Sequence, residues 1–185
     1  MSADRPASSL PGVTYSAIVR HGDERGSFRE LWRAGEFPAE RFVQANLSSS
    51  AAGVLRGLHL HRRQDDLWIV ADGRALVALV DVRPLLDGSG AAVVETRELG
   101  PDESVYIPTG VAHGFLAVEP LQLIYFVTNE YDGSDELGFA WDDPTAAVDW
   151  PDVRATPDGR PILSPRDAAN PLLAELVVRL RDAAI

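Results

Sequence analysis

The stretch Gly53–Gly73, GVLRGLHLHRRQDDLWIVADG, decides the fold that we expect for this chain. His59 and His61 are two residues apart, so in a β-strand both side chains point to one face, while the leucines beside them point to the other. Two imidazoles on the inner face of a small barrel are costly unless they are hydrogen-bonded. With Asp66 further along, the spacing His-x-His-x4-Asp is that of a metal-ligand pattern on a β-hairpin.

Short candidate strands, separated by Gly and Pro, continue along most of the chain. This pattern is typical of an all-β sandwich or barrel. A turn is predicted over 21–26 and a loop over 84–90. Near the C-terminus Asn170, Pro171 and apolar residues at helical spacing predict an amphipathic helix over 171–183. We expect residues 1–12 to form a loose tail and 13–185 a single domain. The strands are predicted over 13–19, 27–32, 42–47, 55–61, 67–70, 74–82, 92–98, 104–107, 113–118 and 122–128.

Composition excludes several kinds of chemistry. The chain of 185 residues is long enough for one domain with a core, and it contains no cysteine, which excludes disulfides and cysteine nucleophiles. All 17 basic residues are arginine, so Schiff-base chemistry on lysine is excluded as well. A net charge of −11 argues against a nucleic-acid partner. No apolar run approaches the ~20 residues that span a bilayer, and with no signal segment evident we expect a cytoplasmic protein with no membrane partner.

A second segment, YIPTGVAHGF at Tyr106–Phe115, is also chemical in character. Its Pro-x-Gly-x-x-His order makes a turn that delivers His113 onto a new strand. The two segments together resemble the two sequence motifs of the cupin superfamily. That resemblance implies a cupin double-stranded β-helix, also called a jelly-roll barrel, with the C-terminal helix added. In metal-binding cupins the matching ligands imply one divalent metal ion, held here by His59, His61, Asp66 and His113, a donor set that suits Fe, Mn, Ni or Zn.

A closer resemblance covers almost the whole chain. Stretches in the same order are similar to the dTDP-4-dehydrorhamnose 3,5-epimerase family of nucleotide-sugar epimerases, which are cupins that need no metal. They are DERGSFRE (23–30), FVQANLSSS (42–50), GVLRGLH (53–59), VALVDVR (77–83), YIPTGVAHGFLAV (106–118), IYFVTNEYD (124–132), WDDPTAAVDWP (141–151) and LSPRDAANPLL (163–173).

This resemblance implies an isomerase that epimerises C3, C5 or both in a dTDP-4-keto-6-deoxyhexose through an enolate, in deoxysugar biosynthesis. His59 would be the general base, Asp167 its carboxylate partner, and Tyr125 the group that returns a proton to the opposite face. The resemblance implies no cofactor, a nucleotide-sugar substrate, and a homodimer in which an N-terminal strand reaches across. Substrate contacts are implied for Arg25, Glu30, Gln44, Asn46, Arg56, His61, His113, Tyr131 and Arg166.

Departures from the family pattern leave alternatives open. The family lysine that follows the base is Asp66 here, the usual Gln two residues after the base is His61, and an aromatic position is Glu130. A divalent cation on the four cupin positions could polarise the ketone instead of the lysine. In a metal-free site, Asp66 would turn outward or pair with an arginine (Arg62, Arg63 or Arg74). Two other functions stay open: a metal-dependent cupin isomerase, lyase or oxygenase, and a non-catalytic sugar-nucleotide binding module.

Overall fold

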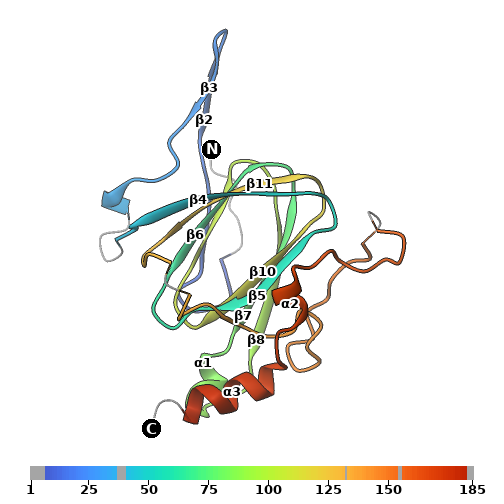
Figure 1. Cartoon of the computed structure of the whole chain (residues 1–185). Helices are drawn as coiled ribbons and strands as arrows, with labels where there is room; N and C mark the ends of the chain where they lie inside the picture. Colours follow the sequence, from blue (N-terminus) through green and yellow to red (C-terminus); the bar gives the residue numbers. More distant parts are fainter. Residues whose placement is uncertain (1–6, 37–40, 132, 154–155, 183–185) are drawn as a thin grey trace.

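Two five-stranded antiparallel sheets face each other and enclose the core (Figure 1). The computed structural model describes residues 7–36, 41–131, 133–153 and 156–182. The strands are β1 (Thr14–Ala17), β2 (Arg20–Asp23), β3 (Gly26–Arg29), β4 (Gln44–Ser50), β5 (Leu55–Leu60), β6 (Asp66–Asp72), β7 (Ala75–Asp81), β8 (Val93–Leu99), β9 (Glu103–Ile107), β10 (Val111–Ala117), β11 (Leu121–Val127) and β12 (Leu137–Gly138).

The strand order confirms the predicted all-β architecture. One sheet has the order β1-β9-β6-β11-β4 and the other β12-β5-β10-β7-β8. The two predicted chemical segments lie together, because β5 pairs with β10 and places His59 directly opposite His113. The segment after β5 returns as β6 in the facing sheet, so the hairpin read from the sequence is a connection between the two sheets.

Apolar side chains from both sheets meet between them. Val70 and Leu123 of one sheet pack with Val77 and Leu79 of the other, and all four are almost fully buried. Burial of each such side chain contributes about 1.5–3 kcal/mol to folding. This core does not fill the interior, because polar side chains line a pocket beside it.

The strands β2 and β3 form a separate ribbon that projects from the barrel (Figure 1). Its base is held by Asp102, which accepts hydrogen bonds from Arg20 Nε at 2.7 Å and Arg29 Nη1 at 2.5 Å. Further out, the Phe28 side chain is 68% exposed. The sequence predicted a turn over 21–26, but most of that segment is strand and only residues 24 and 25 form the turn.

The C-terminal helix packs on the outer side of the second sheet, where Leu176 and Val177 contact the cluster that contains Val80. It begins at Leu173 rather than 171, and the predicted Asn170 cap is wrong. The carboxylate of buried Asp143 accepts a hydrogen bond from the Leu173 amide instead. The predicted end at 183 lies outside the described residues. The helices are η1 (Ala34–Glu36, a 3-10 turn), α1 (Arg83–Asp87), α2 (Pro165–Ala168) and α3 (Leu173–Asp182).

Two further expectations need correction. The predicted loop over 84–90 is partly α1, because Pro84 lies in the first turn of this helix, where an amide hydrogen would have no partner within the helix. The predicted loose tail is wrong for residues 7–12, since Leu10 is 1% exposed in the core and Ser9 is bonded to Glu95. Residues 1–6 lie outside the described part. Among the described residues, no helix is long and apolar enough to cross a membrane.

Candidate functional site

A pocket of about 410 Å³ opens between the two sheets and carries most of the predicted site residues on its wall. Polar and apolar groups share the lining, as is typical of a small-molecule site. The second sheet supplies His59 and His113, and the first supplies Gln44, Asn46 and Tyr125. The complete lining is Gln44, Asn46, Ser48, Arg56, His59, His61, Gln64, Asp66, Trp68, His113, Phe115, Leu123, Tyr125, Val127, Tyr131 and Glu136.

His59 and Asp167 form a hydrogen-bonded pair at this wall. His59 Nε2 lies 2.8 Å from Asp167 Oδ1, and the Ser164 hydroxyl donates to Asp167 Oδ2 at 2.9 Å. Burial disfavours the charged carboxylate, but the hydrogen bonds from His59 and Ser164 outweigh it and lower the pKa of Asp167. An ionised Asp167 accepts the Nε2 proton, which leaves Nδ1 as the ring nitrogen that can take a proton from a ligand.

Two glycines allow the strand that carries His59 to approach β10 closely. Gly57 has a φ of +119°, and a Cβ placed there would lie 2.6 Å from the Gly114 Cα atom. A Cβ on Gly114 would in turn lie 2.8 Å from the Arg56 carbonyl oxygen. Any side chain at either position would push the strands apart, so the glycines of RGLH and HGF set the spacing between His59 and His113.

Tyr125 lies on the sheet opposite His59. Burial raises the pKa of its hydroxyl, and the negative charge of Asp66 raises it further, so the phenol stays protonated. On the neighbouring strand, Gln44 Nε2 donates to Asn46 Oδ1 at 3.0 Å, and Gln44 Oε1 accepts a hydrogen bond from the Tyr131 amide at 3.0 Å. The pocket therefore has an imidazole bonded to a carboxylate on one wall, a protonated phenol on the other, and oriented amides beside it.

His61, Asp66 and His113 form a compact cluster in the same pocket. Their ligand atoms lie within 4.8 Å of one another. Burial lowers the pKa of His113 to about 4, and its imidazole is therefore neutral at pH 7. The alternative four-residue metal set is not assembled, because among the described residues the group of ligand atoms within 4.8 Å of one another does not include His59.

The expected surroundings of Asp66 are wrong. Its carboxylate is 3% exposed, so it does not turn outward, and it is not paired with an arginine. It accepts hydrogen bonds from Gln64 Nε2 at 2.8 Å and Trp68 Nε1 at 3.0 Å instead. Trp68 is buried and also reaches the pocket wall.

The predicted arginines differ in position. Arg56 lines the pocket and donates from Nε to the Ser50 hydroxyl at 3.1 Å. Arg166 stands beside the dyad in α2 and forms an ion pair with Glu136. Burial raises the pKa of Glu136, but the bond from Arg166 outweighs it, so the net shift is downward and the carboxylate is ionised.

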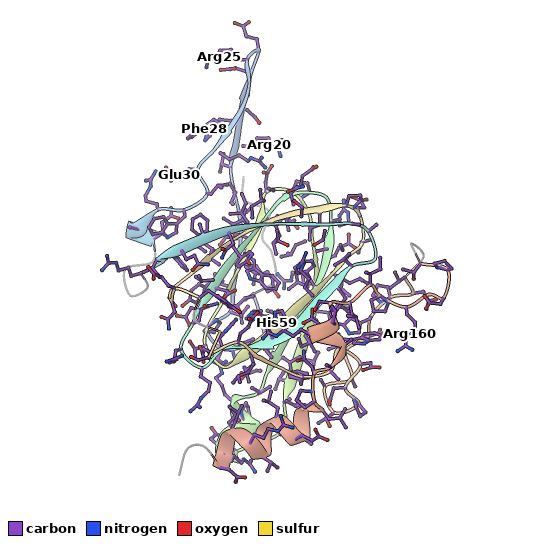
Figure 2. All side chains as sticks on the ribbon, in the orientation of Figure 1. Arg20, Arg25, Phe28, Glu30, His59 and Arg160 are labelled. Carbon is purple, nitrogen blue, oxygen red and sulfur yellow. The ribbon has the colours of Figure 1, made fainter. Side chains whose placement is uncertain are left out.

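Arg25 and Glu30 are not brought to the pocket of their own chain. Figure 2 shows both on the projecting ribbon or just after it, far from His59. Arg25 is paired with Asp23 near the tip, and Glu30 is paired with Arg33. The direction in which the β2–β3 ribbon projects depends on tertiary structure, so the sequence motif alone could not predict it.

Several pocket residues were missed. Glu136 and Asp135 follow the last long strand in an irregular segment without periodicity, although the density of carboxylates there was a signal. The Asp135 side chain does not line this pocket, but the Asp135 carbonyl oxygen accepts a hydrogen bond from His61 Nδ1 at 2.8 Å. Gln64 was missed because its role depends on the position of Asp66. The contact between Ser164 and Asp167 had a sequence signal, because in SPRD (164–167) a serine stands directly before a helix.

Comparisons with known proteins agree with this geometry. A family model described as dTDP-4-dehydrorhamnose 3,5-epimerase matches residues 7–175. The chain is 40% identical over 147 residues to the spore coat polysaccharide biosynthesis protein SpsL of Bacillus subtilis, with 76% of this chain and 96% of that protein covered. It is 34% identical over 180 residues to the dTDP-4-dehydrorhamnose 3,5-epimerase of Salmonella typhimurium, with 92% and 96% covered.

The solved structures give the same result. The dTDP-6-deoxy-D-glucose-3,5-epimerase RmlC of Legionella pneumophila, in complex with dTDP-4-keto-L-rhamnose, is similar with a TM-score of 0.80 and 32% identity, and 94% of each chain is covered. NovW of Streptomyces spheroides, a 4-keto-6-deoxy sugar epimerase, has a TM-score of 0.79 at 32% identity, with 97% of this chain and 89% of that chain covered. The predicted cupin-type barrel is thereby confirmed.

Proposed function

The chain belongs to the dTDP-4-dehydrorhamnose 3,5-epimerase family, and from this premise we propose how its pocket works. It is an isomerase of deoxysugar biosynthesis that acts on a dTDP-4-keto-6-deoxyhexose. In our proposal His59 removes a proton at C3 or C5, and Tyr125 returns one to the opposite face. The hydrogen bond between His59 and Asp167 is the observation that carries this assignment.

The base is prepared by its partner. A C–H bond beside the C4 ketone breaks, the proton passes to His59 Nδ1, and the electron pair moves through the new carbon–carbon double bond onto the C4 oxygen. The Asp167 carboxylate stabilises the imidazolium that forms. Returning a proton to carbon restores the ketone, so no electrons are gained or lost and the reaction needs no redox cofactor.

The acid is placed for inversion. Epimerisation requires the proton to return on the face opposite the one from which it left. His59 belongs to β5 in one sheet and Tyr125 to β11 in the other, so a sugar held between them would be approached from both sides. Because the Tyr125 pKa is raised, the hydroxyl carries a proton to donate.

The remaining polar groups suit a nucleotide sugar. Arg56 faces the pocket and Arg166 stands next to it, and guanidinium groups bind phosphate oxygens in a bidentate manner. Gln44, Asn46 and Tyr131 present amide and phenol groups to the sugar or the base. These local positive charges support binding of a diphosphate to a chain with a net charge of −11.

We further propose a homodimer, located in the cytoplasm. The β2–β3 ribbon leaves its own barrel with Phe28 exposed and Arg25 near its tip (Figure 2). A ribbon of two short strands is marginally stable alone, so a second subunit is expected to cover it. In such a dimer, Arg25 and Glu30 would complete the pocket of the partner.

Deuterium exchange tests the function. The wild-type protein is incubated in D₂O with dTDP-4-keto-6-deoxyglucose, and the C3 and C5 proton signals are followed by NMR. We expect deuterium at C3, C5 or both, together with an epimerised product. Ligand binding without exchange would overturn the proposal and favour a non-catalytic sugar-nucleotide binding module.

A further inference from the structure

We infer that His61, Asp66 and His113 form a binding site for one divalent transition-metal cation in the pocket wall, without His59. Their ligand atoms lie within 4.8 Å of one another, and all three residues line the pocket. Ligands at the usual 2.0–2.2 Å from one ion are roughly 3–3.5 Å apart, so the cluster needs to contract by only about 1 Å. The role that we give the cation in catalysis rests on the proposed function, whereas its binding does not.

Both imidazoles are held in the tautomer that binds metals. His61 Nδ1 lies 2.8 Å from the Asp135 carbonyl oxygen, and His113 Nδ1 lies 3.1 Å from the Val111 carbonyl oxygen. A carbonyl oxygen only accepts hydrogen bonds, so each Nδ1 carries the hydrogen and each Nε2 is left with a lone pair. A histidine whose second nitrogen donates to a backbone carbonyl is the usual outer-shell arrangement at metal sites.

The carboxylate is held just as firmly. Gln64 and Trp68 each donate a hydrogen bond to one oxygen of Asp66. An ionised carboxylate has about four acceptor sites, so these two bonds leave lone pairs for a cation. One residue from the β5–β6 connection, one from β6 and one from β10 thus meet in fixed orientations.

The electrostatics of the cluster favour a cation. Asp66 Oδ2 lies 3.8 Å from His113 Nε2, and with the hydrogen on Nδ1 no proton stands between these two electron-rich atoms. Asp66 is 3% exposed, and a buried carboxylate is costly unless a positive charge accompanies it. A divalent cation would neutralise the carboxylate and occupy both lone pairs.

A cation bound here would act as an electrophile toward the C4 oxygen of the sugar. The negative charge that develops on the C4 oxygen after His59 takes the proton needs stabilisation, and a cation in the same wall supplies it. His59 lies outside the group of ligand atoms that come within 4.8 Å of one another, so one pocket can hold both the proposed base and a metal. Two imidazoles and one carboxylate suit Fe²⁺, Mn²⁺, Co²⁺ or Zn²⁺.

Metal binding tests this directly. Protein made without a histidine tag and stripped with chelator is dialysed against Co²⁺, then measured by elemental analysis, visible absorption and calorimetric titration. We expect one equivalent with the d–d bands of a nitrogen- and oxygen-ligated ion. Asp66→Asn and His61→Gln should each weaken binding about 100-fold or more. His59→Gln should leave stoichiometry and affinity unchanged, and His21→Gln, at the fourth histidine, is the matched control. Circular dichroism checks that each variant folds.

The outcomes separate this inference from the proposed function. No binding of Co²⁺, Mn²⁺, Fe²⁺ or Zn²⁺ by stripped wild-type protein, even at millimolar concentration, overturns the metal site and leaves the epimerase assignment standing if exchange persists. Loss of the metal in His59→Gln as well as in Asp66→Asn overturns the three-residue set. One bound equivalent with no proton exchange supports the metal site while rejecting the epimerase proposal.

Discussion

His59 on β5 and Asp167 in α2 are separated by 108 residues in the sequence and joined by a hydrogen bond of 2.8 Å. The contact holds because Ser164 both caps the short helix and donates to the second carboxylate oxygen. The C-terminal segment therefore fixes the tautomer of an imidazole that belongs to the barrel.

Replacement of Asp167 by Asn should slow catalysis. The amide no longer compensates the imidazolium, so we expect kcat to fall roughly 10²- to 10⁴-fold. KM should change little, because Asp167 does not line the pocket. Steady-state kinetics on the keto-sugar measure both constants. Asp142→Asn, at an exposed carboxylate outside the pocket, serves as the control, and equal kinetics for the two variants would reject the dyad.

Replacement of Tyr125 by Phe should uncouple exchange from inversion. The base can still remove a proton and take up deuterium, but return of a proton on the opposite face loses its donor. We expect the amount of epimerised product, divided by the amount of substrate proton exchanged for deuterium, to fall at least tenfold, because one general acid is lost. NMR in D₂O gives both quantities. Tyr106→Phe, outside the pocket, should keep the wild-type ratio, and an unchanged ratio in Tyr125→Phe would remove that residue from the mechanism.

Stability at acid pH should report the lowered pKa of Asp167. A carboxyl group whose pKa is lower in the folded than in the unfolded protein adds stability above its ordinary value of 3.8, and this contribution is lost as the pH falls through the folded pKa. Urea unfolding of wild type and Asp167→Asn is compared from pH 7 downward. We expect the stability advantage of the wild type to persist above about pH 5 and to shrink only below the ordinary carboxyl value. Loss of the advantage near pH 6 would mean a raised pKa instead.

The ribbon should serve the partner pocket, which mixed dimers can reveal. Arg25→Ala and His59→Gln are each expected to be inactive or nearly so as homodimers. Coexpressed, half of the dimers are mixed, and each mixed dimer has one pocket with its own His59 and the partner's intact ribbon. Activity should therefore recover to roughly a quarter of the wild type. No recovery would place Arg25 in the pocket of its own subunit, and near-wild-type activity of the Arg25→Ala homodimer would place it outside the site.

The sequence predicted most of the barrel, because alternating apolar residues and Gly or Pro turns reflect forces that act within a few residues. It also predicted the partners His59 and Asp167, although only through resemblance, since no local rule joins positions so far apart. Their contact in the structure agrees with that pairing. The glycine positions became interpretable only with coordinates, when Gly57 was found against Gly114.

What the sequence missed depended on tertiary position. Residues 84–90 were predicted to form a loop, yet Pro84 lies in the first turn of α1. Asp66 was placed outward or beside an arginine, because the hairpin pattern did not show that β6 crosses into the facing sheet and buries its first residue. Glu136 lies just before the short strand β12, and its ion pair joins it to Arg166, a residue 30 positions away that no local periodicity connects to it.

The most direct measurement of the central claim is proton exchange by His59→Gln. Glutamine keeps polar atoms near the same place but cannot accept a proton from carbon at neutral pH. With substrate binding verified by calorimetry, we predict that exchange at both C3 and C5 slows by about 10²-fold or more relative to the wild type. Exchange at either carbon within a few-fold of the wild-type rate would contradict the account, because another group would then be removing the proton.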